Sequence, residues 1–250
     1  DLRVRPSEQV MGPGWLGHFL FNAYYPTDEE YVYAMAAMFK GEYEAVVDIG
    51  TRTLGRTSEP TLAAMNGLAM TYVDLARRPE ARALLEATAP LMDATMGPEH
   101  EHTLEVKNNL GWTLYVMKDY EAAERIIAPN LEVQRRVLGP EALPTLTSLN
   151  NLALIYKATG RYQEAEAAHR EEWSIGRRIL GDDHPEVLIS MLNLSRVLIA
   201  SGKRDEAETL LDDALGKARS SLPPVHPLLA AIGTAAGEIA LAKGRRAEAR

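Results

Sequence analysis

The chain repeats itself every 42 residues, and this period constrains its fold more than any other feature. Three short signatures recur at that step. The first centres on Gly97, Gly139 and Gly181, each preceded by Met or Leu. The second places asparagine before leucine and a small residue, at 108–111, 150–153 and 192–195. The third is rich in Glu and Ala, at 118–124, 160–166, 202–208 and 244–249. Signatures that keep one step predict tandem units that stack and bury a continuous core.

Each unit is predicted to contain two helices. In the fourth unit, a stripe of larger apolar residues follows Pro144 at steps of three and four, the spacing of one helical face. The stripe consists of Leu146, Leu149, Leu152 and Tyr156. Gly160 is expected to end this first helix, because glycine adopts the left-handed conformation that helix ends often require.

The second helix of the fourth unit is expected from about Tyr162 to Gly181. Its buried stripe is predicted to be Ala165, Ala168, Ile175 and Ile179. Pro185 suits the first turn of the next helix, with Asp183 as the expected N-cap. Small residues recur where neighbouring helices must approach closely, at Gly111, Ala123, Ala153, Ala165, Ser195 and Ala207.

The pattern Leu-Gly/Ala-x-x-Tyr followed by Gly-x-Tyr-x-x-Ala resembles the tetratricopeptide repeat. It is carried here by Leu152, Ala153 and Tyr156, then Gly160, Tyr162 and Ala165. The 42-residue step with a Leu-Gly-x-x-His-Pro joint is similar to the kinesin-light-chain type of this repeat, which also occurs in bacterial signalling proteins. The resemblance implies an all-α fold, a right-handed α-solenoid of helix-turn-helix repeats whose first helices line a concave groove. Armadillo and HEAT repeats have a similar length but lack the Gly-x-Tyr-x-x-Ala corner.

Two regions are expected along the chain. Residues 1–26 lie outside the repeat and contain an aromatic cluster that includes Trp15 and Phe19. We interpret them as a cap over the first repeat, with a partner contact as the alternative. Residues 27–250 are predicted to form about five helix pairs and an incomplete last repeat, the first pair having its corner at Gly41. We therefore expect the native polypeptide to be longer.

Composition excludes several classes of protein. The formal net charge of −8 disfavours a binder of nucleic-acid phosphates. The absence of cysteine removes disulfide frameworks, cysteine-ligated metals and thiol nucleophiles. No stretch reaches the ~18–20 apolar residues of a membrane span. The sequence thus predicts no nucleic-acid or membrane partner, and we expect a cytoplasmic protein.

The chain offers little that resembles an active site. The most suggestive group is His100-Glu101-His102, because alternating histidines chelate metals on strands and loops. The same repeat position holds His184 and His226, so the repeat itself accounts for one of the two histidines, and no third histidine is near. No nucleophile elbow, P-loop or Rossmann glycine pattern occurs. We therefore predict no enzyme activity, no metal site and no cofactor.

The resemblance implies that ligands lie against the first helices, and helical spacing selects the residues that would face them. The predicted peptide-binding set is Asn108, Asn109, Trp112, Asn150, Asn151, Leu154, Lys157, Asn193 and Arg196. Asparagine offers both a donor and an acceptor, so Asn109, Asn151 and Asn193 would hold a peptide backbone. The open alternative is that these amides support contacts between helices of the solenoid itself.

The leading functional prediction is a noncatalytic protein–protein interaction scaffold that binds a peptide or partner segment. In that role Trp112 and Leu154 would form apolar pockets, and Lys157 and Arg196 would pair with an acidic residue or a phosphate. One alternative is the sensor or regulatory region of a larger bacterial signalling enzyme, such as a kinase, a protease or a nucleotide-binding switch. Another is a self-assembly module whose ends or edges associate between chains.

Overall fold

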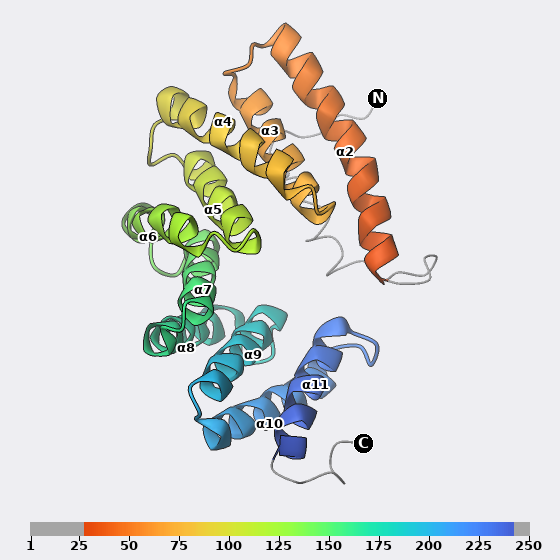
Figure 1. Cartoon of the computed structure of the whole chain (residues 1–250), viewed down its shortest axis with the longest axis vertical. Coiled ribbons are helices and arrows are strands. Elements are labelled where there is room, and N and C mark those ends of the chain that lie inside the picture. Colours follow the sequence, from red (N-terminus) through yellow and green to blue (C-terminus); the bar gives the residue numbers. More distant parts are fainter. Residues whose placement is uncertain (1–27, 243–250) are drawn as a thin grey trace. The chain divides into compact units, whose positions relative to one another are not determined.

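The computed structural model describes residues 28–242, which form helices joined by short turns and contain no strand. The helices are α2 (Asp28–Thr53), α3 (Glu59–Asp74), α4 (Arg78–Met96), α5 (Glu101–Val116), α6 (Tyr120–Val137), α7 (Leu143–Ala158), α8 (Tyr162–Leu180), α9 (Pro185–Ala200), α10 (Arg204–Ser221) and α11 (Pro227–Ala242). Figure 1 shows them in chain order from red to blue. The all-α repeat fold expected from the 42-residue period is confirmed.

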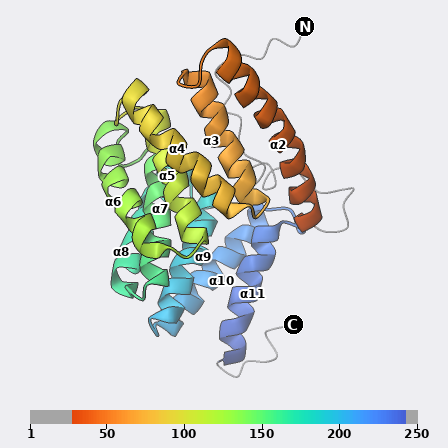
Figure 2. The same ribbon diagram turned by 45° about the horizontal axis from the view of Figure 1, so that its top comes forward.

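The expected helix pairs occur four times within the described residues, as α3/α4, α5/α6, α7/α8 and α9/α10. Helices that follow one another along the chain pack together, for example α3 on α4 and α9 on α10 (Figure 2). The small residues of the signatures lie at these contacts: Ala123, Ala153, Ala165, Ser195 and Ala207 are completely buried. Side chains of this size let two helix backbones approach closely, which explains their recurrence.

The first expected pair is instead a single helix. Gly41, which aligns with the corner signature, lies inside α2 and does not have the positive φ of the other corners. An isolated glycine costs about 1 kcal/mol in a helix interior, which tertiary packing readily offsets. Here Tyr43 and Phe39 of α2 pack with Leu68 of α3 on one apolar cluster, so the helix is held on both sides of Gly41.

The helix corners adopt the left-handed conformation that their glycines predict. Gly160 and Gly202 have φ angles of 79° and 86°. At the equivalent corners Lys118 and Ala76 have φ angles of 65° and 56°. Side chains bearing a Cβ rarely adopt this region, so the repeat geometry imposes it on these two residues.

Histidine caps three of the first helices. The Nδ1 atom of His184 accepts a hydrogen bond from the backbone N–H of Glu186 at 3.2 Å, so His184, and not Asp183, is the N-cap of α9. His100 caps α5 in the same way, and His226 accepts from the backbone N–H of Leu228. The recurring histidine is therefore explained by capping.

The chain divides into two compact units, residues 1–126 and 127–250. A hydrophobic cluster of the second unit joins α9, α10 and α11 through Leu188, Leu211 and Ile232. No helix between residues 28 and 242 is both long and apolar enough to cross a membrane. The predicted cap at 1–26 and the continuation of the last repeat after Gly244 lie outside the described residues.

The buried face of α8 differs from the one predicted. Ala165 and Ala168 are buried as expected, but Ile179 is 37% exposed. His169 and Gly176, which were not predicted, are buried on this helix. Apolar character alone therefore misplaced the last part of this stripe.

Candidate functional site

A chain of polar contacts crosses the first helices of the N-terminal unit. The side-chain amide of Asn109 on α5 donates to Oδ1 of Asn66 on α3 at 3.0 Å. The amide of Asn66 in turn donates to Oε1 of Glu105 at 3.0 Å. One donor and one acceptor of Asn66 are thus used in contacts between neighbouring repeats. This is the alternative role considered for the asparagines, support of contacts between helices of the solenoid.

Aromatic side chains lie beside these amides. Trp112 and Tyr115 of α5 stack with ring centroids 5.2 Å apart, and Tyr120 at the start of α6 tilts against Tyr115 at 5.7 Å. Trp112 and Tyr115 are both only partly buried. Burial, with a smaller effect of Tyr120, raises the pKa of Tyr115. The three rings together offer a rigid apolar contact.

The histidine pair suggested by the sequence has structural partners. His102 lies between Glu105, at 3.5 Å from Nδ1, and Glu59 of α3, at 3.6 Å from Nε2. The hydrogen bond with Glu105 raises the pKa of His102, which burial partly opposes and the charge of Glu59 reinforces. His100 is engaged as the cap of α5. Within residues 28–242, no group of three or more His, Asp or Glu side chains could hold a metal ion.

The C-terminal unit repeats the amide contact two repeats later. The side-chain amide of Asn193 on α9 donates to Oδ1 of Asn150 on α7 at 3.1 Å. Asn150 occupies the repeat position of Asn66, and Asn193 lies two repeats after Asn109. The same pair of positions therefore links neighbouring first helices in both units.

Two cations, Lys157 of α7 and Arg196 of α9, interact unfavourably through their charges. Burial lowers the pKa of the Lys157 ammonium, and the positive charge of Arg196 lowers it further. Arg196 is exposed and Lys157 is half-buried. Neither side chain has a hydrogen bond or ion pair within the described part of the chain. A repelling pair without a carboxylate partner is unusual in a repeat protein whose other arginines are mostly paired.

The predicted binding residues fall into three groups by exposure. Asn108, Asn151 and Asn193 are buried, with exposed fractions of 8%, 6% and 8%. Arg196 is exposed. The remaining predicted residues are half-buried: Asn109, Trp112, Asn150, Leu154 and Lys157. We call Asn109 and Trp112 the N-terminal face, and Asn150, Leu154, Lys157 and Arg196 the C-terminal face.

The sequence reasoning missed two contributors. Tyr115 was not in the predicted set, although it occupies the repeat position of Lys157, which was, and it stacks on Trp112. Glu105, which accepts a hydrogen bond from Asn66, was not in the predicted set either. The spacing of 39 residues between Glu105 and Asn66 is three short of the repeat, one helical turn, and this signal was available in the sequence.

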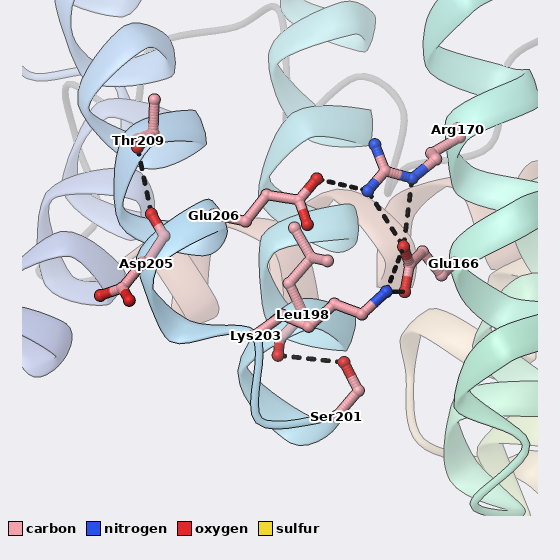
Figure 3. Close-up of polar contacts among 8 residues, drawn as sticks. All are labelled: Glu166, Arg170, Leu198, Ser201, Lys203, Asp205, Glu206 and Thr209. Carbon is pink, nitrogen blue, oxygen red and sulfur yellow. Dashed lines mark hydrogen bonds and ion pairs between the residues drawn. The ribbon is translucent and has the colours of Figure 1, made fainter.

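An ion network joins α8 to the start of α10 in the C-terminal unit (Figure 3). Glu166 of α8 accepts from Lys203 Nζ at 2.8 Å and from Arg170 Nη2 at 3.0 Å. Arg170 also pairs with Glu206 of α10. These contacts pair Glu166 and Arg170 of α8 with Lys203 and Glu206, in contrast to Lys157 and Arg196.

Comparison with known families identifies these repeats. Two family models, each described as Tetratricopeptide repeat, match the chain, one at residues 61–126 and the other at 145–186 and 187–228. Together the matched segments cover more than half of its length. The chain belongs to the tetratricopeptide repeat family. All nine predicted binding residues of this tetratricopeptide repeat protein lie in the matched segments. No curated protein sequence matches it.

Solved structures place the tetratricopeptide repeats near the kinesin-light-chain type. A putative kinesin light chain of Podospora anserina with nearly identical repeats is 26% identical, covers 75% of this chain and 93% of its own, and has a TM-score of 0.64. BtubC of P. vanneervenii is 18% identical with a TM-score of 0.67, covering 89% of this chain and 87% of its own. RapI, in its apo form, is 13% identical with a TM-score of 0.66, covering 89% of this chain and 60% of its own. The last two show a shared fold.

Proposed function

We propose that this tetratricopeptide repeat protein is a noncatalytic scaffold that binds a peptide or partner segment on the first helices of its repeats. The observation that carries the proposal is the pair Lys157 and Arg196, which repel each other and have no acidic partner in the described part of the chain. Holding two like charges close together costs free energy, which an anionic group of a partner would recover. The C-terminal face is therefore suited to a carboxylate or phosphate on the bound segment.

Apolar contacts would supply most of the remaining affinity. Leu154 is half-buried on α7, about one helical turn before Lys157 and at the repeat position of Arg196. In the N-terminal unit, Trp112 stacked on Tyr115 presents a rigid aromatic surface. Aromatic residues that are already ordered lose little conformational entropy on binding, which makes them effective contact residues.

The asparagines have a narrower role in this proposal than the sequence predicted. Asn66, Asn109, Asn150 and Asn193 already bond to one another within each unit. An amide with one donor and one acceptor in use keeps further hydrogen-bonding capacity. Asn109 and Asn150, which are half-buried, are thus the better candidates for contact with a peptide backbone, whereas the buried Asn193 holds Asn150 in place.

A structure with the same fold gives a parallel. One structure is the Rap protein complexed with Competence and Sporulation Factor. It has a TM-score of 0.59 and 13% identity, and the match covers 94% of this chain and 74% of its own. A fold of this kind can therefore hold a bound factor. A binding role would suit both a free adaptor and the regulatory region of a larger signalling enzyme.

The proposal is tested with a displayed random peptide library, selected on the full chain. We expect selected peptides to be enriched in Asp or Glu. Replacing both Lys157 and Arg196 by Ala should abolish that enrichment, with helicity by circular dichroism unchanged. Arg219→Ala is the matched control, because Arg219 is an exposed cation on α10 outside the proposed face.

Three results would argue against the site. If the selected peptides show no enrichment in acidic residues, an anionic ligand is excluded. Equal selection by the double variant would move binding away from the C-terminal face. Trp112→Ala tests the N-terminal face separately, and unchanged affinity for every selected peptide would exclude it. Light scattering over a range of protein concentrations tests self-association, which a rising mass would favour.

A further inference from the structure

The interior of the C-terminal unit contains a histidine where equivalent repeats have aliphatic residues. His169 on α8 is separated by one repeat step from Ile127 and Leu211, and by two from Leu85. All four side chains are completely buried. The other three occurrences show that an aliphatic side chain satisfies this position. The imidazole is therefore not required by the fold itself.

The residue one turn later is also exceptional. Glu172 occupies the repeat position held by Thr88, Asn130 and Ala214, all uncharged. Oε2 of Glu172 lies 2.9 Å from Nδ1 of His169, and only 13% of the Glu172 side chain is exposed. Nε2 of His169 is buried and has no hydrogen-bond partner among the described residues. In this repeat, two positions that are uncharged in the other repeats thus hold His169 and Glu172, a titratable pair in contact.

Few other charges reach this pair. On α9 the charged residues are Glu186 and Arg196, and on α7 the only one is Lys157. Of these, Glu186 acts on Glu172: burial raises the pKa of Glu172, His169 opposes the rise, and the charge of Glu186 adds to it.

The charged neighbours on the remaining elements are already paired. Arg135 of α6 bonds to Glu171, and Glu206 of α10 pairs with Arg170. Among the described residues, no cation other than His169 therefore stabilises the buried carboxylate.

We propose that the His169–Glu172 pair makes the stability of the C-terminal unit depend on pH, with a maximum in mildly acidic solution. With one proton between them, the pair is neutral overall, either as imidazolium and carboxylate or as imidazole and carboxyl. Losing that proton leaves a buried negative charge, and gaining a second leaves a buried positive charge. Both are expensive in a protein interior, so the folded unit retains one proton over a wide pH range.

The direction of the pH dependence follows from counting protons. In the unfolded chain, free Glu and His side chains titrate near ~4.3 and ~6.5, so they hold one proton together only between these values. Above ~6.5 the unfolded pair holds none while the folded pair keeps one, so stability falls as pH rises. Below ~4.3 the unfolded pair holds two, so stability falls as pH falls. On either side the unfolding constant changes by up to about tenfold per pH unit.

Amide hydrogen exchange on the full chain tests the proposal, independently of any peptide ligand. We expect protection of α8 and α9, corrected for intrinsic exchange, to decline from pH ~6.5 to ~8.5 more steeply than that of α2 and α4, which contain no histidine. The decisive variant combines His169→Leu with Glu172→Ala, which introduces the residues found at Leu211 and Ala214. It should remove the steeper decline, because the remaining histidines are unchanged.

The single variant and a spectroscopic measurement complete the test. His169→Leu leaves Glu172 buried without a partner, so it should be less stable than the double variant at neutral pH. If the double variant keeps the pH profile of the unaltered protein, the proposal is wrong. If that variant fails to fold, the carboxyl ¹³C signal of Glu172 in the unaltered protein provides the test, with Glu172→Gln used to assign the signal. Titration of this carboxyl in the ordinary glutamate range would also overturn the proposal.

Discussion

At the scale of single residues, the repeat imposes one backbone conformation on different side chains. Gly160 and Gly202 occupy left-handed corners at little cost. Lys118 and Ala76 occupy the same corner with a Cβ atom, which costs of order 1 kcal/mol for each residue. The repeat tolerates this because the helices on both sides of each corner are packed and determine its geometry.

Lys118→Gly should therefore stabilise the protein, by about 0.5–1 kcal/mol, because relief of the left-handed strain outweighs the greater entropy that glycine gives the unfolded chain. Urea denaturation measures the change. Ala167→Gly is the control, since Ala167 is exposed in the middle of α8 in ordinary helical geometry. It should lose about 1 kcal/mol. A loss of stability in Lys118→Gly would show that the corner is not strained.

At the scale of elements, ion pairs join helices of neighbouring repeats. Glu166 is the centre of the network between α8 and the turn before α10, with Lys203 and Arg170 as donors (Figure 3). Burial tends to raise the pKa of Glu166, but the hydrogen bonds from Lys203 and Arg170 outweigh it, so the pKa is lowered. The network therefore stabilises the ionised carboxylate in the folded state.

Glu166→Gln should destabilise the C-terminal unit by about 1 kcal/mol, since two of the partners are partly solvated. The contribution of Glu166 is present above the ordinary glutamate range and is lost as pH falls through its lowered pKa. Thermal denaturation in acid compares the two proteins: the difference between them should shrink towards low pH. Glu164→Gln, on an exposed carboxylate of the same helix, should change stability much less. A constant difference across this pH range would contradict the assignment.

At the scale of the whole molecule, the division into two compact units predicts that their stabilities are separable. In repeat proteins each repeat contacts only its neighbouring repeats, so a substitution in the core first affects the repeat that contains it and the adjacent ones. Leu188 of α9 is completely buried in the cluster that joins α9, α10 and α11. The N-terminal unit has its own cluster, built from Tyr43 and Leu68.

Leu188→Ala should cost roughly 2–5 kcal/mol in the C-terminal unit, through lost apolar burial and the cavity left behind. Hydrogen exchange resolved by segment should show faster opening of α9 and α10 and little change in α3 and α4. Leu68→Ala is the reciprocal control, with the opposite pattern. Equal acceleration in all helices would show instead that the chain unfolds as one cooperative body.

The repeat determined most of what could be predicted. The step of 42 residues specified the helix pairs, the small residues at their contacts and the glycine corners, because these depend on local spacing and backbone geometry. It also selected the helix faces that carry Trp112 and Arg196. Where the local signal was degenerate the prediction failed: Gly41 lies inside a continuous helix, and His184 replaces Asp183 as the cap.

Only the tertiary structure decided how the polar side chains are used. Nothing in the sequence showed that Asn109 bonds to Asn66, that Lys157 and Arg196 lack a carboxylate among the described residues, or that His169 lies inside while Ile179 faces solvent. These outcomes depend on which side chains from different repeats meet and how much water they lose. A repeat period fixes backbone geometry, whereas hydrogen bonding and charge burial are settled by contacts between helices far apart in the chain.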